Sequence, residues 1–352
     1  MATSASARLL ARRAAFRGAL RAWYGGHRRR LPWREAPSLY GTVLSEFMLQ
    51  QTQVATVLPY FERWRRALPD FAALAVAPEE RVLKLWEGLG YYSRARNLHR
   101  LARALAARPA PPRTPEEWRE LPGVGPYTAA AITSLAFGAP AACVDGNVVR
   151  VLARLTADGT SFRDNTAAAR HFTPAAQALL SRTDPGLHNQ AMMELGALVC
   201  RPRQPRCLEC PVRRFCGAAR RGDPEAYPRL AARKAEACEI LRAWSEHRGR
   251  LLLHRAEVDA RRLAALHELP TPADLGMPAA AVAAAPRLAR YARNITRHRI
   301  TESIHAVVLP AGDRRRLARR AGLRWVPLAE LDRLALSGPH RRWVDAILRA
   351  RA

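Results

Sequence analysis

The stretch Leu121-Pro-Gly-Val-Gly-Pro-Tyr-Thr128 contains two glycines, separated by a single residue, between two segments with helical patterns. Residues 115–120 are expected to form a short helix, and residues 127–137 an apolar, alanine-rich one. Glycine allows positive φ and close approach of the backbone, so the stretch predicts a helix-hairpin-helix. The second helix would begin with N–H groups and a positive dipole end that suit a phosphate. An ordinary helix–helix loop is the alternative, because a Gly-x-Gly turn alone is weak evidence.

The composition points to a polyanionic partner. The chain has 352 residues, enough for two domains that each bury a core, and a net charge of +28. Nearly all the positive charge is arginine, since Lys84 and Lys234 are the only lysines. An anionic membrane would suit the same charge as nucleic acid does. However, no stretch approaches the roughly 20 consecutive apolar residues that span a bilayer, so we expect no membrane partner.

The cysteines and the N-terminus bear on the compartment. Four of the six cysteines cluster within residues 200–216 and no signal peptide is evident, which is unlike a secreted disulfide framework. We therefore expect a cytoplasmic protein with a metal site. Residues 1–13 are rich in Ser, Ala and Arg and lack acids. This pattern fits a mitochondrial transit peptide, or the frayed start of a helix over residues 16–24, which we prefer.

Residues 40–68 contain an acid on an otherwise apolar helical pattern. Val43, Phe47, Val54 and Leu58 mark a core face, and Pro59 is expected to end one helix and start the next. Glu46 is the only carboxylate between residues 35 and 62. Because an unpaired buried carboxylate is costly, two interpretations stay open. Glu46 forms a salt bridge with an arginine, or it is a general acid whose pKa burial raises.

Two further motifs carry polar or aromatic groups in defined places. Asp145 directly precedes an apolar-periodic run and is most simply an N-cap, which would hold it rigidly and ionised at a positive helix end. The stretch Gly88-Leu-Gly-Tyr-Tyr-Ser-Arg-Ala-Arg-Asn97 sets paired tyrosines beside arginines. Such a turn suits base stacking and phosphate contact, although a tyrosine that fills the core is an equal alternative.

The cysteine spacing Cys200-x6-Cys207-x2-Cys210-x5-Cys216 indicates a metal centre. Zinc usually takes two Cys-x2-Cys pairs, and only one is present here. The uneven spacing is more typical of a 4Fe–4S cluster, although the residues alone leave zinc open.

The character of the chain changes after residue 219. Residues 220–235 are polar, contain two prolines and predict a linker. Beyond them, residues 238–243 and 250–255 predict a hairpin across 246–249, and residues 303–309 predict another strand. Residues 328–334 and 340–349 predict helices. The sequence thus predicts a helical domain over residues 1–219 and a smaller α+β domain over residues 236–352.

Several motifs together resemble the MutY family of adenine DNA glycosylases in the endonuclease III superfamily, over about residues 16–217. They are Leu31-Pro-Trp-Arg34, Ser45-Glu-Phe-Met-Leu-Gln-Gln-Thr-Gln-Val54, Gly88 to Asn97, Asp145-Gly-Asn147 and the cysteine spacing. The resemblance implies a mainly α-helical helix-hairpin-helix glycosylase domain with an iron–sulfur cluster loop. The implied ligands of the 4Fe–4S cluster are Cys200, Cys207, Cys210 and Cys216.

The resemblance also implies the chemistry. The bifunctional branch of the superfamily has a catalytic lysine where this chain has Tyr127, and a phenol cannot form a Schiff base. Glu46 would protonate the flipped purine and later help activate water, while Asp145 stabilises the sugar cation. Tyr127 and Asn147 would orient these groups. The implied adenine pocket is Arg34, Leu49 and Gln190, the implied wedges are Gln51 and Tyr91, and the implied phosphate contact is the backbone of Gly123, Val124 and Gly125.

The C-terminal domain resembles the Nudix-like (MutT-like) domain of the same family. The resemblance rests on Leu251–Arg255, residues 263–270 and residues 325–334. The Glu-rich metal box of Nudix hydrolases is absent, so we expect no pyrophosphatase activity. Ile295-Thr-Arg-His298 stands where the family has a Phe-Ser-His type motif that contacts 8-oxoguanine. Thr296 would replace the serine, and Arg297 or His298 the histidine.

The sequence therefore predicts a monomeric, monofunctional adenine DNA glycosylase. Its expected partner is double-stranded DNA that contains 8-oxoguanine:A or G:A mispairs. One alternative is another glycosylase of the superfamily, acting on mismatched thymine or an oxidised pyrimidine, which Tyr127 and Glu46 disfavour. A second is a non-catalytic DNA-binding iron–sulfur protein.

Overall fold

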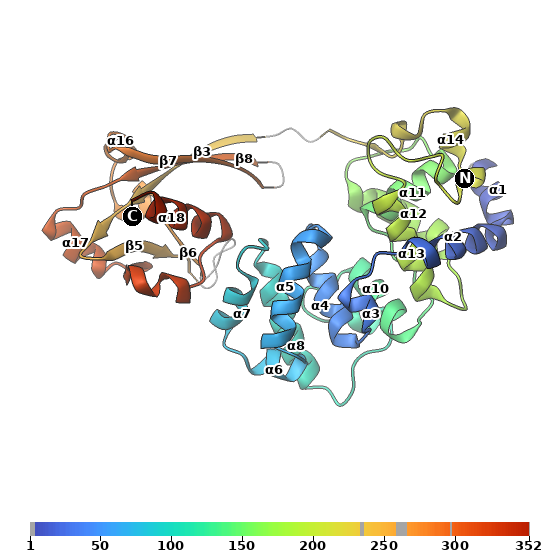
Figure 1. Ribbon diagram of the computed structural model, residues 1–352, viewed down its shortest axis with the longest axis horizontal. Helices are drawn as coiled ribbons and strands as arrows, with labels where there is room; N and C mark the ends of the chain where they lie inside the picture. Colours follow the sequence, from blue (N-terminus) through green and yellow to red (C-terminus); the bar gives the residue numbers. More distant parts are fainter. Residues whose placement is uncertain (1–3, 233–235, 258–265, 296–297, 352) are drawn as a thin grey trace. The chain divides into compact units, whose positions relative to one another are not determined.

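The computed structural model describes residues 4–232, 236–257, 266–295 and 298–351, and the chain forms two compact units (Figure 1). The first, here called the helical unit, consists of Met1–Ala75 and Arg100–Ala232. The second, here called the mixed unit, consists of Val76–His99 and Arg233–Ala352. Val76–His99 thus packs with the C-terminal part of the chain, although in sequence it lies among the N-terminal helices.

The helical unit is built almost entirely of helices. They are α1 (Ser4–Ala11), α2 (Arg13–His27), α3 (Pro32–Glu35), α4 (Leu39–Leu49), α5 (Val54–Ala67), α9 (Pro115–Arg119), α10 (Pro126–Phe137), α11 (Gly146–Thr156), α12 (Asn165–Leu179), α13 (Pro185–Leu198), α14 (Gly217–Arg221) and the 3-10 turns Arg213–Phe215 and Pro224–Ala226. Two helices, α6 (Phe71–Val76) and α8 (Ser93–Ala106), cross the boundary between the units. Strands β1 (Ser161–Phe162) and β2 (Arg229–Leu230) form one short parallel pair.

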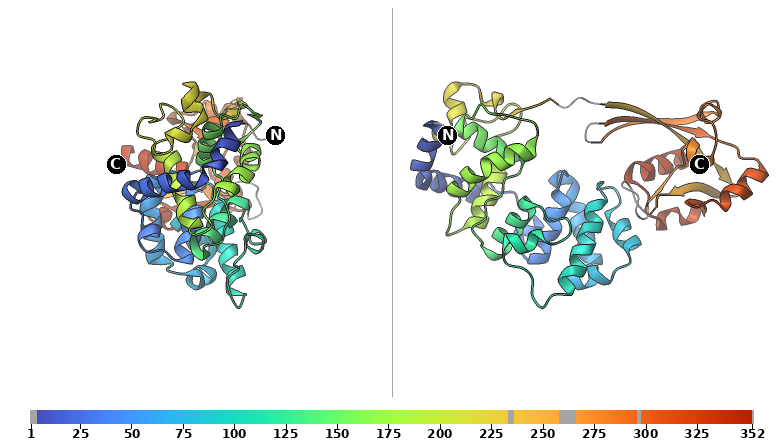
Figure 2. Two further views of the ribbon diagram at one scale, coloured as in Figure 1. Left: turned by 90° about the vertical axis from the view of Figure 1, so that its right-hand side faces the viewer. Right: turned by 180° about the vertical axis from the view of Figure 1, so that it is seen from behind.

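The core of the helical unit lies among α2, α11, α12 and α13, which Figure 2 shows from two further directions. Phe16, Leu20, Leu152, Phe172 and Leu195 are among its buried side chains. Val212 and Phe215 from the cysteine loop join the same core. The loop that carries the cysteines is therefore anchored by apolar burial as well as by its own turns.

The prediction that Pro59 separates two helices is wrong. α4 ends at Leu49, residues 50–53 form the break, and Gln51 adopts a left-handed φ of 57° there. Pro59 lies inside α5. Proline removes one helical hydrogen bond, to the carbonyl of Ala55, but Ala55 and Pro59 are both exposed, so water can satisfy that carbonyl.

The predicted helix-hairpin-helix is present. α9 begins with a capping box between Thr114 and Glu117, and Gly123 takes a left-handed φ of 75° in the turn that follows. Gly125 then caps α10, whose first residue is Pro126. The spacing of the glycines thus reflects one left-handed turn position and one helix start.

The mixed unit contains two sheets with helices on both sides. One sheet has the order β3 (Glu236–Trp244), β8 (His298–Ala306), β7 (Arg287–Ile295). In the other, β5 (Arg250–Arg255) pairs with β4 (Glu246–His247), β6 (His267–Glu268) and β9 (Leu323–Pro327). The helices are α7 (Glu79–Trp86), α15 (Pro272–Leu275), α16 (Ala279–Ala283), α17 (Ala311–Ala318), the 3-10 segment Leu328–Arg333 and α18 (Gly338–Arg351).

Successive side chains of β5 point to opposite faces of the sheet and join two different hydrophobic cores. Leu251 and Leu253 pack with Trp343 and other residues of α18, whereas Leu252 packs with Leu317 of α17 on the opposite face. The sequence prediction of an α+β domain is confirmed.

The pairing predicted within this domain is wrong in part. Arg248 and Gly249 form the expected turn with left-handed φ, and β4 pairs with β5. Residues 238–243, however, belong to β3, which runs parallel to β8 rather than back along β5. β8 offers β3 a partner over all nine of its residues, a longer ladder than the hairpin provides. The predicted helix at 328–334 is a 3-10 segment, and the strand expected at 303–309 spans His298–Ala306.

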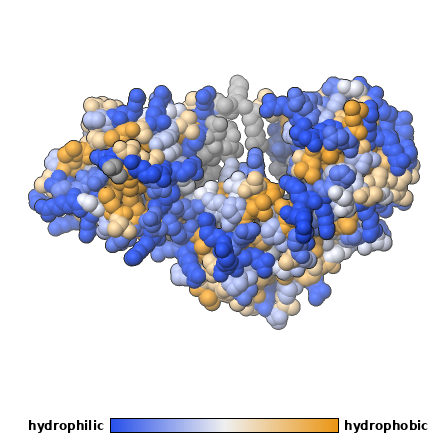
Figure 3. All heavy atoms as spheres, viewed as in Figure 1, coloured by the Kyte–Doolittle hydropathy of each residue, from blue (hydrophilic) through white to orange (hydrophobic). Residues whose placement is uncertain are grey.

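The face of the molecule seen in Figure 3 carries many polar side chains. Hydrophilic side chains cover much of this face, as the net charge of +28 leads one to expect. Within the described ranges, no helix is both long and apolar enough to cross a bilayer.

Candidate active site

Glu46 lies on α4, which packs against α10, and the residue is only 7% exposed. Burial raises the pKa of Glu46 to about 7, the Tyr127 hydroxyl opposes the rise, and the charge on Asp145 adds to it. Arg34 lowers the same pKa slightly but is itself paired with Glu194. Burial without a dedicated counter-ion favours the general-acid interpretation of Glu46 over the salt bridge.

Tyr127 sits in the first turn of α10, where the hairpin places it. Its Oη donates a hydrogen bond to Met193 Sδ at 3.1 Å. Burial, followed by the charges of Glu46 and Asp145, raises the pKa of Tyr127 well above its usual value. The phenol therefore stays neutral and keeps a proton to donate near the Glu46 carboxylate.

Asp145 is the N-cap of α11, as the sequence predicted. Its Oδ1 accepts from the Val148 N–H at 2.7 Å, and its Oδ2 accepts from Asn147 Nδ2 at 3.0 Å. Burial raises the pKa of Asp145, and these two hydrogen bonds oppose the rise. Both oxygens are thus hydrogen-bonded, and the carboxylate is held in one orientation.

Asn147 is held in turn by Arg150, one turn further along α11. Arg150 Nη2 donates to Asn147 Oδ1 at 2.7 Å, and its Nε donates to the Cys200 carbonyl at 2.7 Å. A Cβ at Gly196 would lie 2.7 Å from the Cβ of Asn147, so only glycine allows α13 to come this close to α11. The loop that starts at Cys200 is thereby linked to the aspartate cap.

Two of the three residues predicted for a base pocket, Arg34 and Gln190, belong to a polar cluster. Arg34 and Arg29 both bind Glu194, at 3.0 and 2.8 Å. Gln190 Oε1 accepts from Tyr24 Oη at 2.9 Å. Despite its burial, hydrogen bonds from Arg29 and Arg34 hold the pKa of Glu194 at about 2.

Sequence reasoning missed Glu194, Tyr24 and Arg29 in this cluster. Glu194 follows Gln190 by four residues and so shares its helix face, a signal that was available. Tyr24 contacts Gln190 across 166 positions of sequence, which no local pattern indicates. Leu49, the third residue predicted for the pocket, is the partly buried last residue of α4, three positions after Glu46.

The two predicted wedge residues both have left-handed backbones. Gln51 has φ 57° in the helical unit, and Tyr91 has φ 48° in the mixed unit, with 41% of its side chain exposed. Non-glycine residues adopt this conformation at a cost, and such strain concentrates at functional sites.

The predicted lesion-contact residues are described only in part. Thr296 and Arg297 lie outside the described residues. His298 begins β8, where its Nδ1 is 3.4 Å from Glu236 Oε2.

The hairpin turn exposes Gly123 and Gly125, whereas Val124 is buried. The Val124 N–H donates to the Leu121 carbonyl at 3.2 Å. A ligand at this turn would therefore meet the backbone of the two glycines first.

The four clustered cysteines interact with one another. The pKa of Cys210 is raised to about 12 by burial and then by the charges of Cys200, Cys216 and Cys207. Across the described ranges, no three His, Cys, Asp or Glu side chains stand in an arrangement that would hold a metal ion.

The buried Arg154 connects two of these cysteines. Its Nη1 donates to Cys200 Sγ at 3.4 Å, and its carbonyl accepts from Cys216 Sγ at 3.3 Å. A groove of about 660 Å³ beside Cys210 is lined by Arg213, Arg214 and Arg220 among others. The cysteine loop thus presents positive charge beside its thiols.

The chain is similar to known proteins of DNA base excision repair. Residues 44–173 match the family described as HhH-GPD superfamily base excision DNA repair protein. The adenine DNA glycosylase of Homo sapiens is 46% identical over 222 residues, which are 60% of this chain and 40% of the human protein. That of Mycolicibacterium smegmatis is 39% identical over 196 residues, 55% of this chain and 66% of that protein. The solved structure of a thermostable thymine-DNA glycosylase aligns with a TM-score of 0.54 and 26% identity, over 60% of this chain and 98% of that one.

The chain spans less than half the length of the human and mouse relatives that it matches. The matched region nevertheless includes the hairpin, Glu46 and Asp145. The chain is therefore a homologue of the adenine (MutY) DNA glycosylases, and its residues 44–173 match the HhH-GPD superfamily of base excision DNA repair proteins.

Proposed function

We propose that this chain is a monofunctional DNA glycosylase that removes adenine opposite 8-oxoguanine or G in double-stranded DNA. One observation carries the proposal: Glu46 is a buried carboxyl with a pKa of about 7, and that pKa is raised in part by the charge of Asp145, the N-cap of α11. Two acids with different environments are what acid-assisted cleavage of a glycosidic bond requires. The similarity to curated adenine DNA glycosylases supports adenine as the base.

Each of the site residues is proposed to have its own role in the reaction. The target adenosine is flipped from the duplex, and protonated Glu46 donates to the purine ring so that adenine leaves as a neutral base. The Asp145 carboxylate, held by Asn147 and Val148, stabilises the cationic sugar. Glu46, now a carboxylate, accepts a proton from the attacking water. Tyr127 offers no amine to the sugar, so the product is an abasic site in an intact strand.

The remaining site residues would recognise the substrate. Arg34, Leu49 and Gln190 are proposed to line the adenine pocket, with Arg34 oriented by Glu194. Gln51 and Tyr91 are proposed to wedge into the duplex. The hairpin backbone of Gly123, Val124 and Gly125 is proposed to contact a phosphate, with the exposed Gly123 and Gly125 nearest to it.

As functional domains we propose the glycosylase domain over residues 1–219, a linker over 220–235 and a Nudix-like domain over 236–352. Thr296 and His298 of that domain would contact 8-oxoguanine. The protein would act as a monomer.

We further propose that Cys200, Cys207, Cys210 and Cys216 hold a 4Fe–4S cluster. The chemistry of the donor set supports this proposal, because four cysteine thiolates are the usual ligands of such a cluster and the positive groups of Arg154 and Arg213 lie near these thiols. A bound cluster would cross-link the loop and keep the thiols deprotonated. Protein purified without air should contain iron and sulfide and absorb in the visible range, whereas a colourless protein that carries zinc contradicts the cluster.

Single-turnover release of adenine tests the function. The substrates are duplexes with one 8-oxoguanine:A pair, one G:A pair or one 8-oxoguanine:C pair, and Glu46→Gln is the matched inactive variant. We expect an abasic site in the A strand that becomes a nick only after alkali. The similarity to a thymine-DNA glycosylase makes G:T the duplex to add. Thymine release without adenine release would favour that second function, and binding without release of any base would favour a non-catalytic role.

A further inference from the structure

The loop after α7, here called the Tyr91 turn (residues 87–92), has a strained backbone. Gly88 has φ 105° and Gly90 has φ 71°, and Tyr91 follows at φ 48°. A non-glycine residue stays in the left-handed region only where its surroundings hold it there. With 41% of its side chain exposed, Tyr91 is presented outward by a backbone that is fixed from behind.

One side of the turn is fixed by its own flanking helices. Trp86 Nε1 donates to the Gly90 carbonyl at 3.0 Å. The buried Arg94 donates through Nη2 to the carbonyls of Leu89 and Gly90, each at 3.1 Å. The Arg94 guanidinium also lies 5.4 Å from the centre of the Tyr91 ring.

The other side is fixed by the C-terminal part of the mixed unit. The backbone N–H of Leu336 donates to Glu87 Oε2 at 3.0 Å, and its carbonyl accepts from Tyr92 Oη at 3.0 Å. Leu336 and Tyr92 are both buried. A single residue more than 240 positions away thus binds the residues on both ends of the turn.

Arg341, in the first turn of α18, completes this contact. Its Nε donates to Glu87 Oε1 at 2.7 Å, while its Nη2 donates to the carbonyls of Leu331 and Leu334 at 2.7 and 2.9 Å. The side chains of Glu87 and Arg341 are only 10% and 12% exposed, so water screens the pair little.

Close packing supports the same contact. A Cβ at Gly338 would lie 3.2 Å from the Cα of Gly88, so the two glycines bring α18 directly against the turn. Lys84 Nζ also donates to the Leu334 carbonyl at 3.2 Å.

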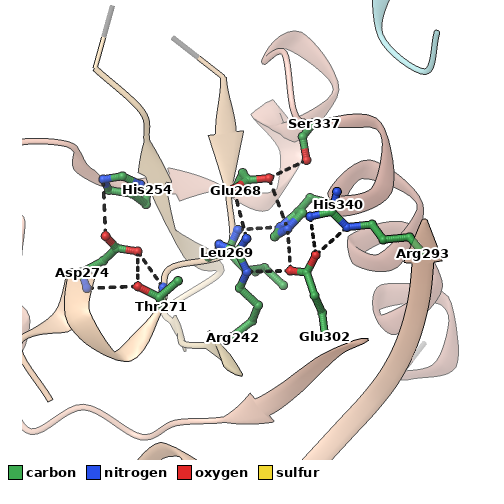
Figure 4. Close-up of polar contacts among 10 residues, drawn as sticks. All are labelled: Arg242, His254, Glu268, Leu269, Thr271, Asp274, Arg293, Glu302, Ser337 and His340. Carbon is green, nitrogen blue, oxygen red and sulfur yellow. Dashed lines mark hydrogen bonds and ion pairs between the residues drawn. The ribbon is translucent and has the colours of Figure 1, made fainter. Parts of the chain in front are cut away.

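The segment that holds the turn is itself mounted on the sheet (Figure 4). Ser337 Oγ donates to Glu268 Oε1 at 2.8 Å, and His340 Nδ1 accepts from the Leu269 N–H at 2.8 Å. His340 Nε2 faces Glu302 at 3.4 Å. Glu302, on β8, is fully buried and binds Arg242 of β3 and Arg293 of β7 at 2.7 and 2.6 Å.

We propose that Arg341 and Glu87 are positioning residues that fix the Tyr91 turn to the sheet formed by β3, β8 and β7. Tyr91, the proposed wedge residue, and the strands β7 and β8 are then held by one framework. Loss of the Arg341–Glu87 pair frees the turn and weakens the preference for 8-oxoguanine over G, with the groups that cleave the bond left in place. This inference rests on the proposed function for its effect on catalysis, but the anchoring is testable without it.

Hydrogen exchange in the full chain, free of DNA, measures the anchoring directly. The variants are Arg341→Gln and Glu87→Gln; in the second, the new amide oxygen can still accept from Leu336. Arg351→Gln is the matched control, because Arg351 lies on the same helix and its ion pair, with Glu246, is elsewhere. We expect amide exchange over residues 86–92 to rise by about tenfold in both variants, the size that loss of one charge-assisted hydrogen bond produces, and not in the control.

Single-turnover adenine release measures the consequence. We expect the ratio of rates opposite 8-oxoguanine and opposite G to fall by about tenfold in Arg341→Gln. In a Tyr91→Ala background the same substitution should lower the ratio no further, because a positioning residue acts only through the group that it positions.

The outcomes separate the two ideas. Unchanged exchange over residues 86–92 in both variants overturns the anchoring, and an equal fall of the ratio with and without Tyr91 overturns the positioning role. The variants could show faster exchange over residues 86–92 while the wild-type protein releases no adenine from any duplex. That result supports the anchoring and overturns the proposed function instead.

Discussion

Asn147 Nδ2 donates a 3.0 Å hydrogen bond to one oxygen of the Asp145 carboxylate, while the other oxygen caps α11 through the Val148 N–H. The carboxylate is thus held in one orientation by Asn147 and Val148, the second and third residues of the helix that it caps. Arg150 continues the contact to the carbonyl of Cys200, so the position of the carboxylate also depends on the cysteine loop. A group fixed in this way can oppose positive charge without reorganising during the reaction.

Asp145→Asn should separate stability from activity. Asparagine caps a helix about as well as aspartate, so we expect the free energy of unfolding to change by less than about 0.5 kcal/mol. The rate of adenine release should fall by about 100- to 1,000-fold, because the negative charge is lost. Urea unfolding and single-turnover release measure the two effects.

Asp145→Ala is the matched control for the cap, and should cost about 1 kcal/mol of stability in addition. Asp145→Asn protein that keeps the wild-type rate would remove Asp145 from the mechanism.

Glu46→Gln should abolish the acid step. We expect the single-turnover rate to fall by about 100- to 10,000-fold, the usual contribution of a general acid. In the wild type, the protonated fraction of Glu46 decreases as the pH rises through its pKa of about 7, so the rate of release should decrease over the same range. A pH–rate profile of the wild type that is flat between pH 6 and 8 contradicts this role.

Tyr127→Phe should shift that profile. The Tyr127 hydroxyl lowers the pKa of Glu46, so its removal should raise that pKa further and move the decline in rate to higher pH. The ring keeps its volume, so we expect little change in packing. Tyr60→Phe on α5 provides a control, and an unshifted midpoint in Tyr127→Phe would show that the hydroxyl does not act on Glu46.

Local patterns in the sequence predicted the parts of the site that depend on near neighbours. The position of Asp145 before an apolar run predicted its cap, and the Gly123–Gly125 spacing predicted the hairpin. The approach of Glu46 to Asp145 joins two helices about one hundred residues apart, so it followed from the family resemblance rather than from any pattern.

Long-range pairing limited the rest of the prediction. The β3–β8 ladder joins residues 62 apart, and either β5 or β8 satisfies the alternation of β3 equally well. Tyr24 reaches Gln190 from the opposite end of the helical unit's sequence. The prediction of a boundary at Pro59 is wrong because a proline is tolerated inside a helix where water reaches the freed carbonyl, and the local pattern does not give that exposure.

Glu194→Gln should weaken both the fold and the pocket. The substitution leaves Arg29 and Arg34 without their shared carboxylate, and breaking a buried ion pair costs about 3 kcal/mol or more. Because the pKa of Glu194 is lowered to about 2, its contribution is present above pH 4.5 and is lost as the pH falls from 4.5 toward 2.

The difference in unfolding free energy between wild type and Glu194→Gln should therefore shrink over that acid range, as urea titrations at pH 7 and pH 3 would measure. We also expect a higher KM, since Arg34 loses its orientation. Glu35→Gln removes an exposed partner of Arg30 and serves as the control, with little change in stability. A difference that stays constant between pH 7 and pH 3 contradicts the assignment.

Glu46 should lower the stability of the folded protein wherever it is ionised. Burial raises its pKa from 4.5 to about 7, so the folded state binds a proton more tightly than the unfolded state does. Its contribution to stability is therefore full below pH 4.5 and decreases as the pH rises to about 7, by up to about 3 kcal/mol. Glu46→Gln lacks this penalty and should unfold at a higher temperature than the wild type at pH 8, with the advantage vanishing near pH 5. Most substitutions of buried residues destabilise, so an inactive variant that gains stability only at alkaline pH would identify Glu46 as an acid kept buried for its chemistry. Equal melting temperatures of the two proteins at pH 8 would instead show that ionised Glu46 is well accommodated by its surroundings.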